Sequence, residues 1–296
     1  MCGIAGLFGY AASAPPVDCE ELRRIRERMA ARGPDGSGEW YSADRRVGLA
    51  HRRLAIIDLT DAAAQPMHDP ETGNVVIFNG EIYNYRSLRR DLEARGIAFR
   101  TQSDTEVLLA LYRVHGSDML PKIRGMFAFA LWDAYRQGLL LARDPFGIKP
   151  LYDADDGRTL RFASQVKALL AGGGVDTAPE PAGHVGFFLW GHVPDPFTLY
   201  RGIRALPAGT ALWVAKDGRR KTLVFFDSPG SSASHRARQP RRAPPRLGSG
   251  CATPCSTRSA ITWWPTSQSG CSSRREKTPP PWPLWRPRRP RARSKR

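Results

Sequence analysis

"MCGIAGLFGY", residues 1–10, is a short apolar run that is interrupted by glycines and places a cysteine directly after the first methionine. Such a run predicts a buried β-strand that begins at Cys2. If Met1 is removed, the thiol of Cys2 lies beside a free α-amino group with a pKa of about 7.7–8.0, which can act as its general base. The plain alternative is a small buried cysteine without chemistry. The segment therefore predicts either an N-terminal nucleophile or a core residue.

Strands and helices alternate through the first 227 residues. Apolar runs predict strands at 47–59, 74–80, 126–133, 138–144 and 159–164. Apolar residues at helical spacing predict helices at 18–31, 83–94 and 104–115. Clusters of strands beside a pair of helices indicate two sheets enclosed between helical layers.

The charge is divided unevenly along the chain. Residues 1–227 carry 29 basic and 27 acidic residues, whereas residues 228–296 carry 16 basic residues, one acidic residue and 12 prolines. The second segment has too little apolar surface to offset its ordering entropy, so we expect a disordered basic tail. Weak binding of polyanions is the functional extension of such a tail, but we expect no specific nucleic-acid partner.

Several classes of protein are excluded by the sequence pattern. No apolar run reaches the ~18 residues of a membrane span, and the first residues lack a signal-peptide pattern, so we expect a cytoplasmic protein without a membrane partner. Five cysteines follow no disulfide framework. No histidine pair follows Cys251 and Cys255, so we expect no metal site there.

Six motifs occur in an order and spacing that carry a family resemblance: "MCGIAG" (1–6), "RGPDG" (32–36), "HRRLAIID" (51–58), "FNGEIYNY" (78–85), "SDTE" (103–106) and "ARDPFGIKPLY" (142–152). Together they resemble the class II glutamine amidotransferases, and most closely the glutaminase domain of asparagine synthetase. For residues 2–227 the resemblance implies an α+β fold, a four-layer αββα sandwich of the N-terminal nucleophile hydrolase type. It also implies L-glutamine as substrate and leaves a homodimer open.

The resemblance assigns three catalytic residues. The thiolate of Cys2 would attack the side-chain carboxamide of glutamine, and its own amine would carry the proton to the departing ammonia. The side-chain amide of Asn79 and the backbone N–H of Gly80 would stabilise the oxyanion. Asn79-Gly80 is also a common hairpin-turn dipeptide, which is the alternative for these two residues.

The resemblance also assigns the groups that bind the zwitterionic amino acid. Arg53 would hold the carboxylate, and Glu81 and Asp104 would hold the ammonium group. The rest of the glutamine pocket would be lined by Leu54, Ile56, Ile57, Asn79 and Gly80. As alternatives, Asp104 could cap the following helix, and Arg53 could belong with Arg52 to a solvated pair.

The parent enzyme of this family uses ATP, Mg²⁺ and aspartate in a second, synthetase domain. Its phosphate-binding "SGGxDS" loop does not occur in this sequence. We therefore expect this chain to need no cofactor and to catalyse at most the glutaminase half-reaction of the ligase. The alternatives are an amidotransferase for another carboxylate acceptor and an inactive truncated protein with a polyanion-binding tail.

"ITWWPTSQSG", residues 261–270, indicates that the synthetase domain is encoded in a shifted reading frame. Tryptophan has a single codon, so a one-base shift of the reading frame fixes valine and alanine around Trp263 and Trp264. With permissible third bases elsewhere, residues 258–279 read "VRDHLVADVPVGVFLSAG", then K or E, then "DS". This resembles the segment that leads into the phosphate-binding loop. We therefore expect residues 228–296 to be a frameshifted remnant of the synthetase domain.

Overall fold

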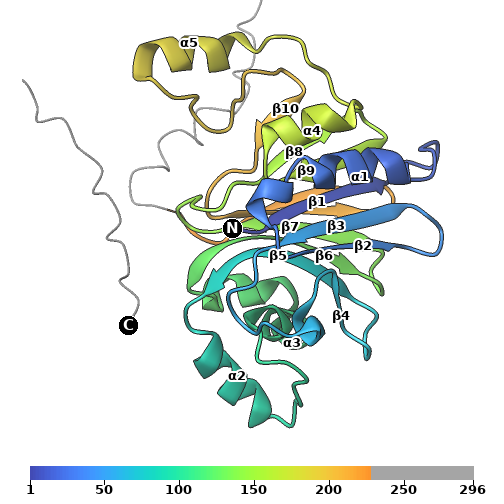
Figure 1. Ribbon diagram of the computed structural model, residues 1–296, viewed down its shortest axis with the longest axis vertical. Coiled ribbons are helices and arrows are strands. Elements are labelled where there is room, and N and C mark those ends of the chain that lie inside the picture. The colour runs from blue at the N-terminus through green and yellow to red at the C-terminus, as the bar shows by residue number, and fades with distance from the viewer. Residues whose placement is uncertain (228–296) are drawn as a thin grey trace, which may run out of the picture. The chain divides into compact units, whose positions relative to one another are not determined.

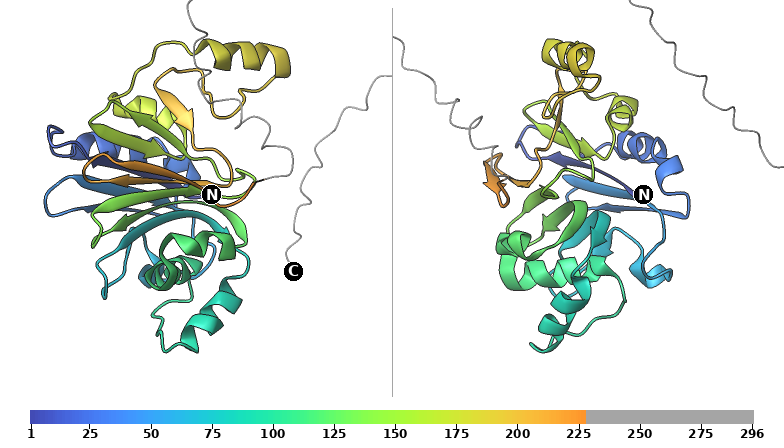
Figure 2. Two further views of the ribbon diagram at one scale, coloured as in Figure 1. Left: turned by 180° about the vertical axis from the view of Figure 1, so that it is seen from behind. Right: turned by 90° about the vertical axis from the view of Figure 1, so that its left-hand side faces the viewer.

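The structure, a computed structural model, describes residues 1–227. The predictions for the basic tail, the Trp263–Trp264 pair, Cys251 and Cys255 and the frameshifted segment lie outside the described residues. Within the described part, two six-stranded antiparallel sheets face each other, with helices on both outer sides (Figures 1 and 2).

The first sheet has the strand order β10-β8-β9-β1-β3-β2. Its strands are β1 (Gly3–Gly9), β2 (Gly36–Tyr41), β3 (Val47–Arg53), β8 (Tyr152–Asp155), β9 (Thr159–Ala163) and β10 (Ile203–Ala205). Every residue of β1 is buried, because β1 lies between β9 and β3 and both of its faces are covered. The apolar run at the start of the sequence is therefore an interior strand, as predicted.

The second sheet has the order β12-β11-β7-β6-β5-β4. Its strands are β4 (Met67–His68), β5 (Val75–Ile82), β6 (Gly125–Asp133), β7 (Gly138–Arg143), β11 (Thr210–Ala215) and β12 (Arg220–Val224). The short β4 pairs only with Val75 and Val76. Within residues 1–227, most of the outer edge of β5 therefore has no neighbouring strand.

Three cores follow from these layers. Ile4, Val75 and Ile77 belong to the core between the sheets. Helices α1 (Cys19–Glu27) and α4 (Val166–Gly172) pack on the outer face of the first sheet, and α2 (Tyr85–Glu93) and α3 (Asp104–His115) on that of the second (Figure 1). Helix α5 (Pro181–Trp190) lies beyond the first sheet. The four-layer αββα fold is confirmed.

The helix predicted at 104–115 is observed with those bounds, and two others are shorter than predicted. The segment 18–31 ends as a helix at Glu27 and continues as the short turn Ala30–Arg32, while 83–94 begins at Tyr85. The strand predicted at 47–59 ends at Arg53, because the chain leaves the sheet as a loop in which Asp58 has a positive φ of 51°. That loop reaches the site described below.

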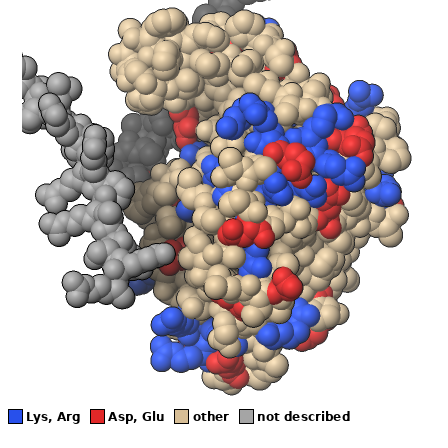
Figure 3. All heavy atoms as spheres, in the orientation of Figure 1, with Lys and Arg blue, Asp and Glu red and all other residues tan. Residues whose placement is uncertain are grey.

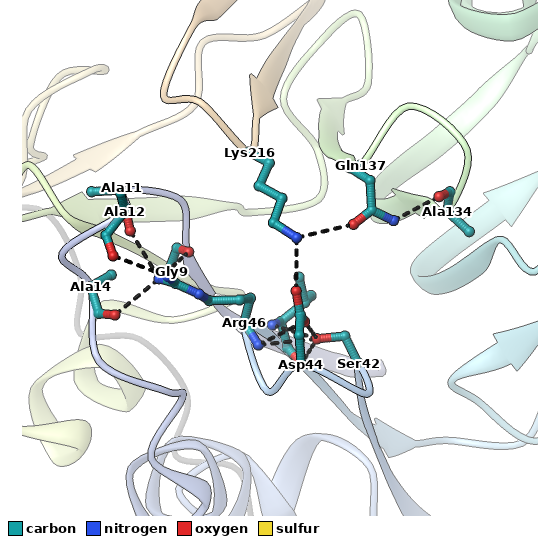
Figure 4. Close-up of polar contacts among 11 residues, drawn as sticks. Gly9, Ala11, Ala12, Ala14, Ser42, Asp44, Arg46, Ala134, Gln137 and Lys216 are labelled. Atoms are coloured by element: carbon teal, nitrogen blue, oxygen red, sulfur yellow. Dashed lines mark hydrogen bonds and ion pairs between the residues drawn. The ribbon is translucent and has the colours of Figure 1, made fainter.

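The end of the sandwich away from Cys2 is joined by polar contacts (Figure 4). The guanidinium of Arg46 donates to four carbonyl groups at the end of β1 and in the loop that follows, those of Gly9, Ala11, Ala12 and Ala14. Lys216 Nζ lies 2.9 Å from Asp44 Oδ2 and so connects the β11–β12 turn with the β2–β3 turn.

One face of the described domain shows both signs of charge. Basic and acidic side chains are interspersed on the face seen in Figure 3. In residues 1–227, no helix combines the length and apolar character needed to cross a bilayer.

Candidate active site

All nine residues predicted for the site line one pocket: Cys2, Arg53, Leu54, Ile56, Ile57, Asn79, Gly80, Glu81 and Asp104. The pocket spans about 620 Å³ when its open mouth is counted. Strand alternation explains how they meet. Cys2 shares the inter-sheet side of its strand with Ile4, and Asn79 shares that of β5 with Val75 and Ile77.

Cys2 lies at the wall of the pocket and is half-buried. The N–H of Leu54 donates to Cys2 Sγ at 3.4 Å, and the thiol lies 3.6 Å from the Leu54 carbonyl oxygen. Arg32 Nε donates to the Cys2 carbonyl at 3.0 Å. Burial lowers the pKa of Arg32, although the nearby Cys2 opposes this shift. The thiol is thus held at a polar, accessible position instead of being packed in a core.

Asn79 and Gly80 lie inside strand β5, opposite Ala128 and Phe127, so the alternative of a hairpin turn is wrong. Asn79 is 1% exposed, and its Nδ2 has no hydrogen-bond partner among the described residues. A buried amide donor without a partner is costly unless a ligand or water satisfies it. Asn79 therefore presents an unused donor at the pocket that also contains the Cys2 thiol.

The N–H of Gly80 points to the open edge of β5. Its neighbours of the same parity show the direction: Phe78 N–H donates to Gln65 Oε1, and Ile82 N–H donates to Asp104 Oδ2. Phe127, the residue opposite Gly80, uses its N–H and carbonyl for Asp144 instead. Peptide groups of alternate residues face the same edge of an antiparallel strand. The Gly80 N–H therefore faces away from β6. Together with Asn79 Nδ2 it gives two open donors beside the pocket.

Arg53 is held by the loop that follows it. Its Nη1 donates to the Thr60 carbonyl at 3.0 Å, and its Nη2 donates to the Asp58 carbonyl. Three of the five guanidinium N–H donors remain for a ligand. Arg52 instead forms an ion pair with Glu27 at 3.2 Å, so the alternative of a solvated Arg52–Arg53 pair is wrong.

Asp104 and Glu81 supply negative charge to the pocket. Asp104 is 4% exposed, and its pKa is raised to about 6, because burial and then the nearby Glu81 carboxylate outweigh the backbone hydrogen bonds that it accepts. The capping alternative for Asp104 is wrong, because Ser103 is the N-cap of α3 and its Oγ accepts the Thr105 N–H at 3.0 Å. The Asp104 carboxylate therefore stays at the site, and it forms no ion pair with any side chain of residues 1–227.

Leu54, Ile56 and Ile57 come from the loop between Arg53 and Asp58. Leu54 holds the thiol through its backbone, whereas the side chain of Ile56 is 70% exposed and lies at the mouth of the pocket. The sequence reasoning named neither Gln65 nor Lys149 as a pocket residue, although both line the pocket and Lys149 is 6% exposed. Gln65 belongs to none of the six motifs, so no sequence signal marked it.

No group of three or more His, Cys, Asp or Glu side chains that could hold a metal ion occurs within residues 1–227. The site consists instead of a thiol, two open N–H donors, one guanidinium and two carboxylates. These groups suit a zwitterionic amide.

The sequence profile of the family described as "Glutamine amidotransferase domain" matches residues 1–225. The chain belongs to this glutamine amidotransferase family. It is 40% identical over 227 residues to asparagine synthetase (glutamine-hydrolyzing) 1 of Bacillus subtilis, a match that covers 76% of this chain and 35% of the relative. Asparagine synthetase B of Escherichia coli is 38% identical over 232 residues, covering 77% and 35%.

The amidotransferase thus spans about a third of the length of these asparagine synthetases and corresponds to their glutaminase domain. A relative with another name, amidase chry2 of Gibberella zeae, is 40% identical over 181 residues, covering 58% of this chain and 27% of the relative. The predicted family is confirmed.

Solved structures agree on the fold. Glutamine phosphoribosylpyrophosphate amidotransferase of B. subtilis, complexed with ADP and GMP, matches with a TM-score of 0.54 at 20% identity, covering 77% of this chain and 50% of that chain. A structure described as the allosteric regulatory enzyme of purine biosynthesis matches with a TM-score of 0.57, at the same identity and coverage. At this identity the amidotransferase shares the fold with these two enzymes.

Proposed function

We propose that this domain hydrolyses L-glutamine to glutamate and ammonia through a thioester on Cys2. In the longer parent protein, the ammonia would serve ATP-dependent synthesis of asparagine from aspartate, with ATP and Mg²⁺ bound in the second domain. The observation that carries the proposal is the pair of open donors at Asn79 and Gly80, which lie in the pocket of a half-buried thiol.

The first step forms a bond between Cys2 Sγ and the side-chain amide carbon of glutamine. Once Met1 has been removed, the α-amine of Cys2 takes the thiol proton. Asn79 Nδ2 and the Gly80 N–H stabilise the negative charge that develops on the amide oxygen. The amine then gives its proton to the leaving nitrogen, the C–N bond breaks, and ammonia departs from a γ-glutamyl thioester.

The second step is the hydrolysis of that thioester. The neutral amine of Cys2 takes a proton from a water molecule that attacks the same carbon, and the same two donors stabilise the second oxyanion. Cleavage of the C–S bond releases glutamate and restores the thiol. No oxidant, metal or further reactant is needed for this half-reaction.

The charges of the pocket match the two ends of the amino acid. Arg53 has free N–H donors for a bidentate contact with the α-carboxylate. Asp104 and Glu81 would receive the ammonium group, which supplies the cation that the carboxylates lack. Leu54, Ile56 and Ile57 would enclose the aliphatic part of the ligand.

The test is glutamine hydrolysis by the full chain, with removal of Met1 verified by intact mass. Cys2→Ala should abolish glutamate formation, and the wild-type protein should form a γ-glutamyl adduct on the N-terminal peptide. Cys19→Ala is the matched control, because Cys19 is the other free cysteine of the described residues and lies outside the pocket. Equal glutamate formation by the wild type and Cys2→Ala, or none by a wild type that lacks Met1, contradicts the proposal.

A second candidate is an amidotransferase that delivers ammonia to another carboxylate acceptor. The relative named amidase chry2 favours it, since similar amidotransferase sequences occur in proteins not named asparagine synthetase.

We also propose that residues 228–296 are a frameshifted synthetase segment. Sequencing the coding DNA after Asp227 tests this, because the shifted frame should encode the phosphate-binding loop and stop codons in that frame would contradict it.

A further inference from the structure

The outer edge of β5 is completed by side chains where a neighbouring strand is absent. Beyond the pair that Val76 forms with Met67, the first residue of β4, the next outward-facing peptide groups of β5 belong to Phe78, Gly80 and Ile82. Side chains form hydrogen bonds with the backbone N–H and carbonyl of Phe78 and with the N–H of Ile82. The Gly80 N–H has no such partner among the described residues. The edge therefore has an opening one peptide group wide, next to Asn79.

We propose that Gln65 is a positioning residue for the oxyanion donors, fixing the Phe78–Asn79 segment of β5 against the start of helix α3. The proposal rests on the function proposed above and adds to it a residue that does not touch the reacting atoms. Gln65 Oε1 accepts the Phe78 N–H at 2.6 Å, and Gln65 Nε2 donates to Thr105 Oγ1 at 3.2 Å. One amide group thus links the strand that carries Asn79 to the residue that follows Asp104.

His51 holds the other polar group of Phe78. It comes from β3 in the opposite sheet, is fully buried, and its Nε2 lies 3.2 Å from the Phe78 carbonyl oxygen. Burial lowers the pKa of His51 to about 3, so the ring is neutral and its Nε2 carries the proton that it donates. Gln65 and His51 therefore restrain Phe78 from two directions, and the peptide that follows carries Asn79.

This restraint acts on the transition state more than on substrate binding. Donors that already point at the position of the developing charge avoid reorganisation when the charge forms. Gln65 uses an oxygen and a nitrogen for protein partners, while Arg53, Glu81 and Asp104 supply the charges that would hold the zwitterion. Loss of Gln65 should therefore lower kcat and leave KM for glutamine nearly unchanged.

The first test is Gln65→Met in the full chain with Met1 removed. This change keeps the length of the side chain and removes both hydrogen bonds. We expect kcat to fall about tenfold or more while KM stays within about twofold. Gln137→Met is the matched control. Gln137 also makes two side-chain contacts, with Ala134 and Lys216, at the far end of the sandwich (Figure 4), and its loss should leave kcat unchanged.

Substitutions at Thr105 separate positioning from general packing. Thr105→Val keeps the shape and removes the acceptor of the Gln65 amide, so kcat should fall by less than in Gln65→Met. Thr105→Ser keeps the hydroxyl and should retain most of kcat. Equal loss in the valine and serine variants would indicate packing and overturn the assignment.

A double-mutant cycle with Asn79→Ala identifies the path of the effect. If Gln65 acts through Asn79, Gln65→Met should cost far less in the Asn79→Ala background than in the wild type. The same factor in both backgrounds contradicts the proposal. Alkylation of Cys2 by iodoacetamide, which needs no oxyanion donors, should proceed at the same rate in wild type and Gln65→Met.

Hydrogen exchange at the Phe78 amide gives a readout that does not depend on glutaminase activity. The Phe78 N–H should exchange slowly in the wild type and at least tenfold faster in Gln65→Met, with Gln137→Met unchanged. Unchanged exchange overturns the link between Gln65 and Phe78 even if the protein proves inactive. A wild type with protected Phe78 but no glutaminase activity would instead contradict the proposed function.

Discussion

Asp104 is the residue whose environment departs most from that of a free side chain within the pocket. Its carboxylate is buried and lies near Glu81, and both effects favour the protonated form. In the free protein, an ionised Asp104 therefore destabilises the fold and is available for a cation. Under the proposed function, the ammonium group of glutamine would relieve this unfavourable interaction.

The pH dependence of glutamine binding follows from this environment. Because the pKa of Asp104 is about 6, the carboxylate is ionised above that pH and loses its charge below it. KM for glutamine should therefore rise as the pH falls from about 7 to 5, whereas Asp104→Asn should have a high KM that varies little over this range. Steady-state kinetics from pH 5 to 8 check this, and a wild-type KM that is flat in pH contradicts it.

Asp104→Asn should impair glutamine binding but increase the stability of the fold. A folded-state pKa above the usual aspartate value of 3.8 means that the folded protein binds more protons than the unfolded chain between about pH 4 and 6, so stability falls as the pH rises through that window. At pH 7.5, Asp104→Asn should raise the free energy of unfolding by about 1 to 3 kcal/mol. Urea unfolding without glutamine measures the change, and a destabilised variant would contradict this origin of the raised pKa.

At the scale of elements, β5 depends on a glycine, Gly80. Gly80 lets the strand pack closely against β6, and its N–H faces the outer edge of β5 beside the pocket. A Cβ on Gly80 would lie 2.3 Å from the Met126 carbonyl oxygen, which belongs to the neighbouring strand β6. The strand cannot move away to relieve that contact without also moving Asn79. The absence of a side chain at Gly80 is therefore needed for the packing of β5 against β6 and, under the proposed function, for catalysis as well.

Gly80→Ala should both destabilise the protein and lower kcat. We expect a loss of about 2 kcal/mol or more in the free energy of unfolding, because backbone of two strands must shift. Gly36→Ala in β2 is the matched control, since a Cβ there would make only an ordinary contact, at 3.7 Å from Arg53 Cβ. Thermal unfolding and glutaminase assays of both variants test this, and equal stability of the two would contradict the steric argument.

At the scale of the whole described domain, the two ends of the sandwich differ: one contains the pocket, and at the other, polar contacts connect the turns. Cys2 and Asn79 lie where the sheets leave a pocket, and Arg46, Asp44 and Lys216 connect turns of both sheets at the other end (Figure 4). Burial raises the pKa of Asp44, but hydrogen bonds from Lys216, Ser42 and Arg46 outweigh it and lower the pKa to about 2.

Asp44→Asn tests what this tie contributes. Because the folded-state pKa is depressed, the contribution is present above about pH 4 and is lost as the pH falls towards 2. The pair is nearly half-exposed, so its loss at pH 7 should cost less than about 1 kcal/mol. Urea unfolding at pH 7 and near pH 2 measures it, and a difference between wild type and variant that persists at pH 2 contradicts the argument.

Much of the fold and the pocket followed from local patterns. Short-range periodicity predicts the interior strand at Gly3–Gly9, helix α3 and the alternation of β5. The six motifs contain every residue that lines the pocket except Ala63, Gln65 and Met126. Gln65 and His51 could not be assigned their contacts, because these depend on which sheet edges meet in space. The same holds for β4 and the end of β3, where a tertiary contact decides the boundary.

The position of Met1 in the pocket has a practical consequence. Met1 lines the pocket together with Cys2, and β1 is fixed between two strands from Gly3 onward. Any residues placed before Cys2, including a purification tag, must therefore start within the pocket that we propose for glutamine. Under the proposed chemistry, activity requires that Cys2 carry a free α-amine, so any residue left in front of it inactivates the protein twice: it acylates the general base and it fills the pocket.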